Sequence, residues 1–180
     1  MKRFLIISIA LTLVAVVAIV VRPLFVHADD SLMTEAHIQR IKSNCSEAQS
    51  TLFQLHASDA LLRVNRGQLY ESISTKLMEP FNSRLTINSY NAADMVSIAS
   101  NYDSELTTFR LNYQQYEEAM SATLAINCTN QPVAFYDSVT DTRAKRSKVH
   151  DSALVLHKTI SDYETAFEAF AAKNFPETAK

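Results

Sequence analysis

The chain has 180 residues, with 17 basic and 19 acidic side chains and a single glycine, Gly67. One glycine cannot supply a glycine-rich phosphate loop, a dinucleotide-binding turn, or the many tight turns of a β-sandwich. The slightly acidic balance gives no basic surface for nucleic acid, so we expect an all-α protein with no nucleic-acid partner.

The N-terminus has the pattern of an export segment. Two basic residues precede an unbroken apolar run, residues 4–21, and an Arg-Pro pair follows it. The run exceeds the ~7–15 residues of a usual signal-peptide core and approaches the ~18–20 of a membrane-spanning helix. Two outcomes stay open: cleavage between Ala28 and Asp29, or an uncleaved signal anchor that holds the protein in the membrane. Either outcome predicts that residues 29–180 are extracytoplasmic, as one domain.

Three periodic segments follow, and they predict helices at about residues 32–79, 92–126 and 133–173. Their apolar residues recur at alternating steps of three and four, the heptad rhythm of helices that pack along their length. The connector Pro80–Asn91 begins with a helix-breaking proline, and Pro132 closes a shorter turn. We therefore expect an elongated, antiparallel, coiled-coil-like three-helix bundle.

Each predicted helix carries one stripe of residues for the core, and Gly67 indicates a kink or a close helix crossing in the first. The first stripe comprises Ile38, Ile41, Cys45, Ala48, Leu52, Leu55, Asp59, Leu62, Arg66, Leu69 and Ile73. The second is aromatic and comprises Met95, Ala99, Tyr102, Leu106, Phe109, Tyr113, Tyr116 and Met120. The third comprises Tyr136, Val139, Arg143, Arg146, His150, Ala153, Leu156, Ile160, Tyr163, Phe167 and Phe170.

The two cysteines, Cys45 and Cys128, are predicted to form a disulfide. Counting equally outward from the turn between Glu79 and Ala92 places Cys45 opposite Ile126, two residues short of Cys128. An exported protein whose two cysteines meet in space is expected to oxidise them. Both also lie within Asn-Cys-Ser/Thr glycosylation patterns, and a thiol metal pair is a third interpretation. A bridged cysteine would crowd the acceptor asparagine, and no further cysteine completes a metal site.

The same counting aligns polar residues that interrupt the stripes. It places Asp59 level with Tyr113 and Arg146, Arg66 with Glu105, and Glu117 with Arg143. The residues of this polar layer are Asp59, Arg63, Arg66, Glu105, Tyr113, Glu117, Arg143 and Arg146.

Two interpretations of the polar layer stay open. A partly buried ionic layer would fix helix register. A ligand site would use the arginines and tyrosines to hold a carboxylate or phosphate. They differ in their prediction for Arg146→Leu: a ligand site loses binding with melting nearly unchanged, whereas a register layer loses stability.

Part of the chain resembles a known group of proteins. The stretch HASDALLRVNRGQLYE, His56–Glu71, and the stretch QPVAFYD, Gln131–Asp137, resemble segments of uncharacterised exported helical proteins of small-genome bacteria. That resemblance implies an extracytoplasmic, bacterial setting and lends no activity.

The function we expect is a structural or interaction role in the cell envelope, with a protein partner or a second copy. The membrane is a further partner if residues 1–28 are retained. Small-anion binding at the polar layer is the alternative from a different class, and a holdase chaperone fits the helices but not the core pattern. No nucleophile elbow and no metal-binding histidine motif occurs, so we expect no catalysis, metal or cofactor.

Overall fold

The computed structural model describes residues 33–175, and every regular element among them is a helix. Residues 35–175 belong to a compact unit that begins at Glu35. The predicted export segment, with Ala28 and Asp29, lies outside the described residues. No helix between residues 33 and 175 combines the length and apolarity needed to cross a bilayer.

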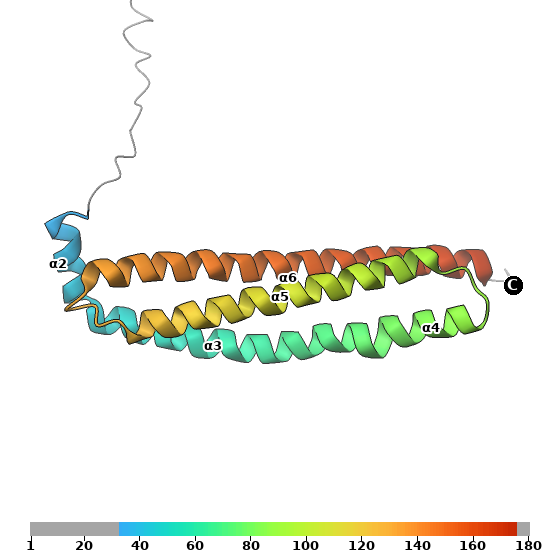
Figure 1. The fold of residues 1–180 in the computed structure, drawn as a ribbon, viewed down its shortest axis with the longest axis horizontal. Helices are drawn as coiled ribbons and strands as arrows, with labels where there is room; N and C mark the ends of the chain where they lie inside the picture. The colour runs from blue at the N-terminus through green and yellow to red at the C-terminus, as the bar shows by residue number, and fades with distance from the viewer. Residues whose placement is uncertain (1–32, 176–180) are drawn as a thin grey trace, which may run out of the picture. The chain divides into compact units, whose positions relative to one another are not determined.

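The chain runs along the unit three times (Figure 1). The elements are α2 (Glu35–Ser43), α3 (Cys45–Ser72), the π-helix η1 (Ile73–Met78), α4 (Glu79–Ile87), α5 (Ala93–Ala125) and α6 (Pro132–Asn174). α5 returns antiparallel to the path from α3 to α4, and α6 runs antiparallel to α5 with the most extensive packing of any pair. The helices predicted at 92–126 and 133–173 agree with α5 and α6 within one residue at each end.

The prediction of one unbroken helix from residue 32 is wrong, because the helix breaks at Asn44. The Asn44 amide nitrogen and its side-chain Nδ2 both donate to the Arg40 carbonyl, at 3.2 and 3.0 Å. The Ser43 hydroxyl donates to the same oxygen at 3.0 Å. Such local side-chain bonds compete with helix continuation. α2 therefore ends here and bends away from the axis of α3 (Figure 1).

The prediction that the helix ends before Pro80 is also wrong. The chain stays helical to Ile87, and Pro80 occupies the first turn of α4. Directly before it, η1 widens the backbone, and the Glu79 N–H bonds to the Ser74 carbonyl five residues back. Proline lacks an N–H and its ring clashes with the carbonyl four residues earlier, so the wider turn removes the conflict. The real connector spans only residues 88–92.

The core follows the aromatic stripe of α5. All eight residues predicted for that stripe are buried, and Thr123 extends it. Tyrosines in this core satisfy their hydroxyls across helices: Tyr102 donates to the Tyr70 carbonyl at 3.0 Å, and Tyr163 to Asn82 Oδ1 at 2.9 Å. No buried side-chain nitrogen or oxygen of the described residues lacks a hydrogen-bond partner.

The stripes predicted for the other two helices are only partly correct. In α6, Leu156, Tyr163 and Phe170 are buried as predicted, but small polar residues take several other core positions. The buried residues of α6 are Pro132, Phe135, Thr142, Ser152, Leu156, Thr159, Tyr163 and Phe170. Thr142 and Thr159 bond to side chains of α5, which brings the two helices close together.

In α3 the predicted stripe holds as far as Asp59 and then fails. Leu62, Arg66 and Leu69 are exposed, and Tyr70 is the next buried side chain. The expectation that Gly67 marks a close helix crossing is wrong, because a Cβ built there would meet nothing within 4 Å. Between Asp59 and Tyr70, therefore, α3 buries no side chain.

The two cysteines meet as predicted, at disulfide distance. Their Cα atoms are 5.5 Å apart across a sequence separation of 83. Cys45 opens α3, and Cys128 is fully buried in the turn after α5. The pair joins the open end of the hairpin that α3 and α5 form.

Candidate functional site

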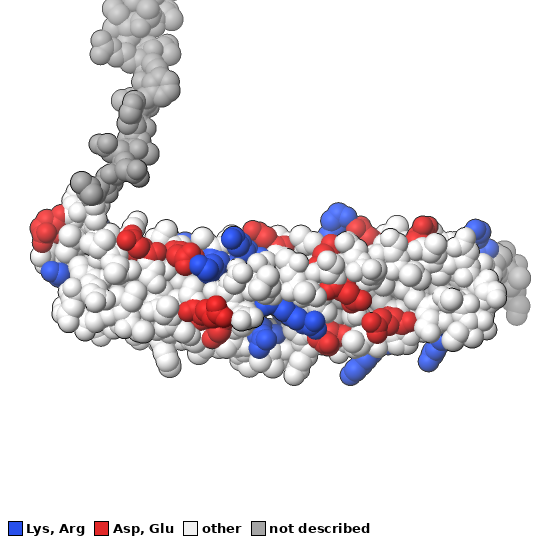
Figure 2. Space-filling view, in the orientation of Figure 1, with Lys and Arg blue, Asp and Glu red and all other residues white. Residues whose placement is uncertain are grey.

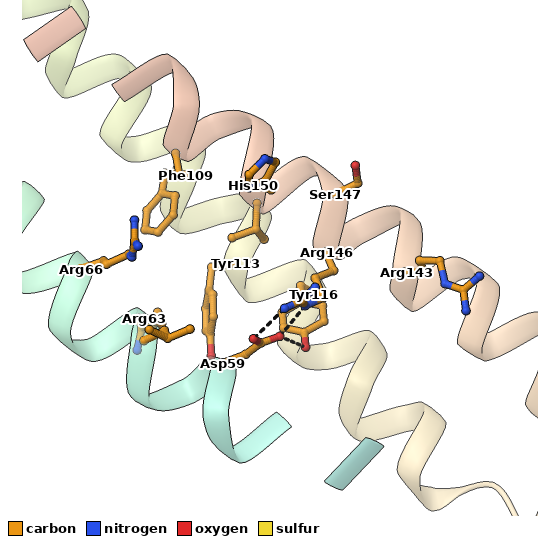
Figure 3. Close-up of a pocket in the computed structure, with 13 residues that line it drawn as sticks. Asp59, Arg63, Arg66, Phe109, Tyr113, Tyr116, Arg143, Arg146, Ser147 and His150 are labelled. Atoms are coloured by element: carbon orange, nitrogen blue, oxygen red, sulfur yellow. Dashed lines mark hydrogen bonds and ion pairs between the residues drawn. The ribbon is translucent and has the colours of Figure 1, made fainter. Parts of the chain in front are cut away.

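A groove lies between α3 and α6, with α5 as its floor (Figure 3). We call it the arginine groove, and its volume is about 590 Å³. It is lined by Asp59, Leu62, Arg63 and Arg66 of α3, by Phe109, Tyr113 and Tyr116 of α5, and by Arg143, Arg146, Ser147, Val149, His150 and Ala153 of α6.

A single ionic bridge crosses this groove. Arg146 donates from Nε to Asp59 Oδ2 at 2.6 Å and from Nη2 to Oδ1 at 3.0 Å. The Tyr116 hydroxyl donates to Asp59 Oδ2 at 2.6 Å. The structure therefore joins Asp59 and Arg146, which sequence counting placed at one level.

The electrostatics of this bridge are asymmetric. The Asp59 side chain is 10% exposed and that of Arg146 is 49% exposed. Burial alone would raise the pKa of Asp59, but the bonds from Arg146 and Tyr116 outweigh it and hold the pKa below its usual value. The bond to Asp59 raises the pKa of Arg146. Burial, followed by the Asp59 bond, raises the pKa of Tyr116 well above its usual value. Asp59 therefore stays ionised and Tyr116 neutral at ordinary pH.

The two other charge pairs predicted for the polar layer do not form. Glu105 accepts bonds from Thr159 and Asn101, at 2.5 and 2.8 Å, and does not meet Arg66. Neither Arg66 nor Arg143 makes an ion pair with any residue between 33 and 175. The Arg66–Glu105 pair was counted from an assumed connector at Pro80–Asn91, whereas the real connector spans only residues 88–92. The Glu117–Arg143 pair was counted from the second turn, and it does not form because Glu117 pairs with His56.

Glu117 joins a different network, outside the groove lining. It pairs with His56 of α3 and accepts a bond from the Tyr113 hydroxyl at 2.8 Å. Burial alone would raise the pKa of Glu117. The bonds from His56 and Tyr113 outweigh this effect and hold the pKa below its usual value. The Arg63 guanidinium lies 4.8 Å from the centre of the Tyr113 ring, a cation–π contact.

Six of the eight predicted layer residues line the groove, and the two glutamates do not. Sequence reasoning missed Phe109, Tyr116 and His150 as groove residues, although all three were in the predicted stripes. Tyr116 lies three residues after Tyr113 in the same stripe. Allowing for an error of one helical turn in the counting would have identified Tyr116 as a partner of Asp59.

Charges of both signs are mixed elsewhere on the surface. The face in Figure 2 shows acidic and basic side chains interspersed along the helices. Among the described residues no cluster of three or more His, Cys, Asp or Glu side chains has metal-binding geometry. The arginine groove is lined by four arginines and one carboxylate, that of Asp59.

Comparisons with models of protein families, with curated proteins and with solved structures found no match. The arguments for function therefore rest on the geometry of this chain.

Proposed function

We propose that the protein is an elongated antiparallel three-helix bundle with a structural or interaction role in the cell envelope. The extensive contact between α5 and α6 and the antiparallel course of α3 along α5 support this architecture. The apolar run of residues 4–21 and the cysteine pair at disulfide distance support an extracytoplasmic location.

The observation that carries the interaction role is an uncovered apolar stripe on α3. Phe53, Leu61 and Val64 are 64%, 64% and 47% exposed. With the exposed Ala57 and Gln68 they recur at steps of three and four along one face. A stripe of this spacing is typical of a helix that packs against another helix.

The occupant we propose for this stripe is α3 of a second copy. None of the five stripe residues carries a charge, so two copies related by a two-fold axis can meet without burying one. A two-fold axis makes the same stripe meet itself on both copies, so the assembly closes as a dimer of bundles.

Light scattering coupled to gel filtration, on the exported protein purified without reductant, tests this dimer. We expect a dimer that Leu61→Glu converts to a monomer. Leu111→Glu is the matched control, because Leu111 is 53% exposed on α5, outside the stripe. A wild-type monomer, or dissociation by the control alone, would contradict the proposal. Crosslinking of α3 to a different envelope protein would identify another occupant.

Intact mass of the same sample tests the location. A mass that begins at Asp29 and lacks two hydrogens indicates a cleaved signal and an oxidised Cys45–Cys128 pair. A full-length mass in the membrane fraction indicates an anchored bundle. A full-length, reduced protein in the cytosol would contradict the extracytoplasmic proposal.

Small-anion binding, as in a sensor or carrier, is a second candidate function. It is favoured by one specific observation, the arginines of the groove that have no carboxylate partner, and it does not depend on the dimer.

A further inference from the structure

The arginine groove holds more positive charge than its own carboxylate can balance. Asp59 is the only acidic residue in the lining, and Arg146 and Tyr116 occupy both of its oxygens. Arg63 stacks on the Tyr113 ring and interacts with Glu117 without forming an ion pair, and Arg66 makes no ion pair with the described residues. The chain as a whole has a formal charge of −2, so this excess is local.

The walls of the groove are largely apolar. Leu62 of α3, Phe109 of α5, and Val149 and Ala153 of α6 contribute aliphatic or aromatic surface. The volume of about 590 Å³ lies within the range of pockets that bind small organic molecules. A small hydrated anion would leave this apolar surface uncovered, whereas a ligand with an apolar body would cover it.

The ionic bridge divides the groove into two ends. Figure 3 places Arg63, Arg66, Phe109 and His150 on one side of the bridge and Arg143 on the other. The side with Arg66 and Phe109 therefore combines cationic and aromatic side chains, which is the pairing that an amphipathic anion needs. Guanidinium groups bind planar carboxylates through two parallel hydrogen bonds.

We propose that the end of the arginine groove between Arg63, Arg66 and His150 binds an amphipathic carboxylate. The carboxylate lies against the two arginines of α3, and the apolar body lies on Phe109 between α3 and α6. The inference deepens the second candidate function, rests on it, and names its ligand class. Arg146 belongs to the structural bridge and is not the anion-binding residue.

Fluorescence titration with 1-naphthoate tests the site in the exported protein. The chain has no tryptophan, so the naphthalene signal is free of tryptophan emission. We expect saturable binding with a Kd below about 1 mM. The neutral analogue 1-naphthylmethanol has the same ring without the charge, and acetate has the charge without the ring. Both should bind at least about tenfold more weakly.

Matched variants locate the bound probe. Arg66→Gln should weaken naphthoate binding at least about tenfold without lowering the melting temperature, because Arg66 makes no ion pair in the described structure. Arg84→Gln, on the exposed surface of α4, should bind naphthoate like the wild type.

Three results would overturn the inference. Absence of saturable naphthoate binding would reject the amphipathic ligand, and absence of acetate binding as well would remove small-anion binding at this groove. Equal binding of acetate would retain an anion site but reject the amphipathic ligand. Equal binding by wild type and Arg66→Gln would move the probe away from this groove. None of these results affects the dimer test, which concerns the separate stripe of Phe53, Ala57, Leu61, Val64 and Gln68.

Discussion

α5 and α3 carry heptad stripes of similar quality, but only α5 is buried along its whole length. Nine of the 33 residues of α5 are buried, against three of the 28 residues of α3. α5 packs against α6 along its length and also contacts α3, η1 and α4. α3 packs less extensively against α5 than α6 does, and the arginine groove lies between α3 and α6. A stripe therefore predicts which face seeks a partner, whereas the neighbours present decide how far it is buried.

The cysteine pair gives the largest test of this difference, because it fastens the loosely packed α3 to the end of α5. Replacing both Cys45 and Cys128 with serine should lower the free energy of unfolding by about 2–5 kcal/mol. The bridge would close a long loop, with a sequence separation of 83, so the unfolded chain gains much entropy without it. Urea unfolding with and without reductant measures the effect. Wild type in reductant should match the double variant, and an unchanged midpoint would contradict the bridge.

A matched pair of leucines compares the two helices directly. Leu106 on α5 is 4% exposed, whereas Leu61 on α3 is 64% exposed. Leu106→Ala should destabilise the protein by about 2–5 kcal/mol, because it leaves a cavity in the core. Leu61→Ala should change stability by less than about 0.5 kcal/mol in the monomer. Urea unfolding at low protein concentration measures both. Similar losses would show that α3 is covered even in the monomer.

The sequence predicted α5 well because this helix has neighbours on two sides. All eight predicted stripe residues are buried, so periodicity alone identified them. The cysteine pairing also followed from counting between turns, since two or three residues of error still leave cysteines within reach. A register error of two or three residues does exclude a predicted charge pair, because an ion pair requires direct contact between the two side chains. The predicted Arg66–Glu105 pair is wrong for that reason, whereas Glu117 pairs with His56 instead of Arg143.

Two features could not be predicted from the sequence because each departs from the usual local preference: a proline inside a helix, and small polar residues in the core. A proline such as Pro80 usually ends a helix, but the wider π-helix directly before it accommodates the proline ring and its missing N–H. Small polar residues such as Thr142 and Thr159 occupy the core face of α6, where periodicity favoured larger residues. Their hydroxyls find partners on α5, an arrangement that only the packed structure reveals.

The ionic bridge connects the two regions at one level, and its contribution should depend on pH. Asp59→Asn should cost about 1–2 kcal/mol near neutral pH, a modest value because Arg146 is half exposed. The pKa of Asp59 is lower in the folded state than its usual value. The unfolded chain therefore takes up the proton first, and wild-type stability falls as pH drops below about 4.

Urea midpoints between pH 3 and pH 7, for wild type and Asp59→Asn, measure this dependence. The variant should lose less stability in acid than the wild type. Some decline should persist, because the pKa of Glu117 is lowered as well. Parallel curves for the two proteins would indicate that the bridge does not contribute to folding.

The smallest expected effect concerns Gly67, in the C-terminal half of α3. A Cβ at this position would meet nothing within 4 Å, and the residue has ordinary helical geometry without a positive φ. Gly67→Ala should therefore stabilise the protein by up to about 1 kcal/mol, through helix propensity and a less flexible unfolded chain. Urea unfolding measures the gain. Ala57→Gly, at an exposed position on the same helix, should lose a similar amount. If Gly67→Ala destabilises the protein while Ala57→Gly behaves as expected, the part of α3 around Gly67 packs against a neighbour in solution. The difference in burial between α3 and α5 would then have to be revised.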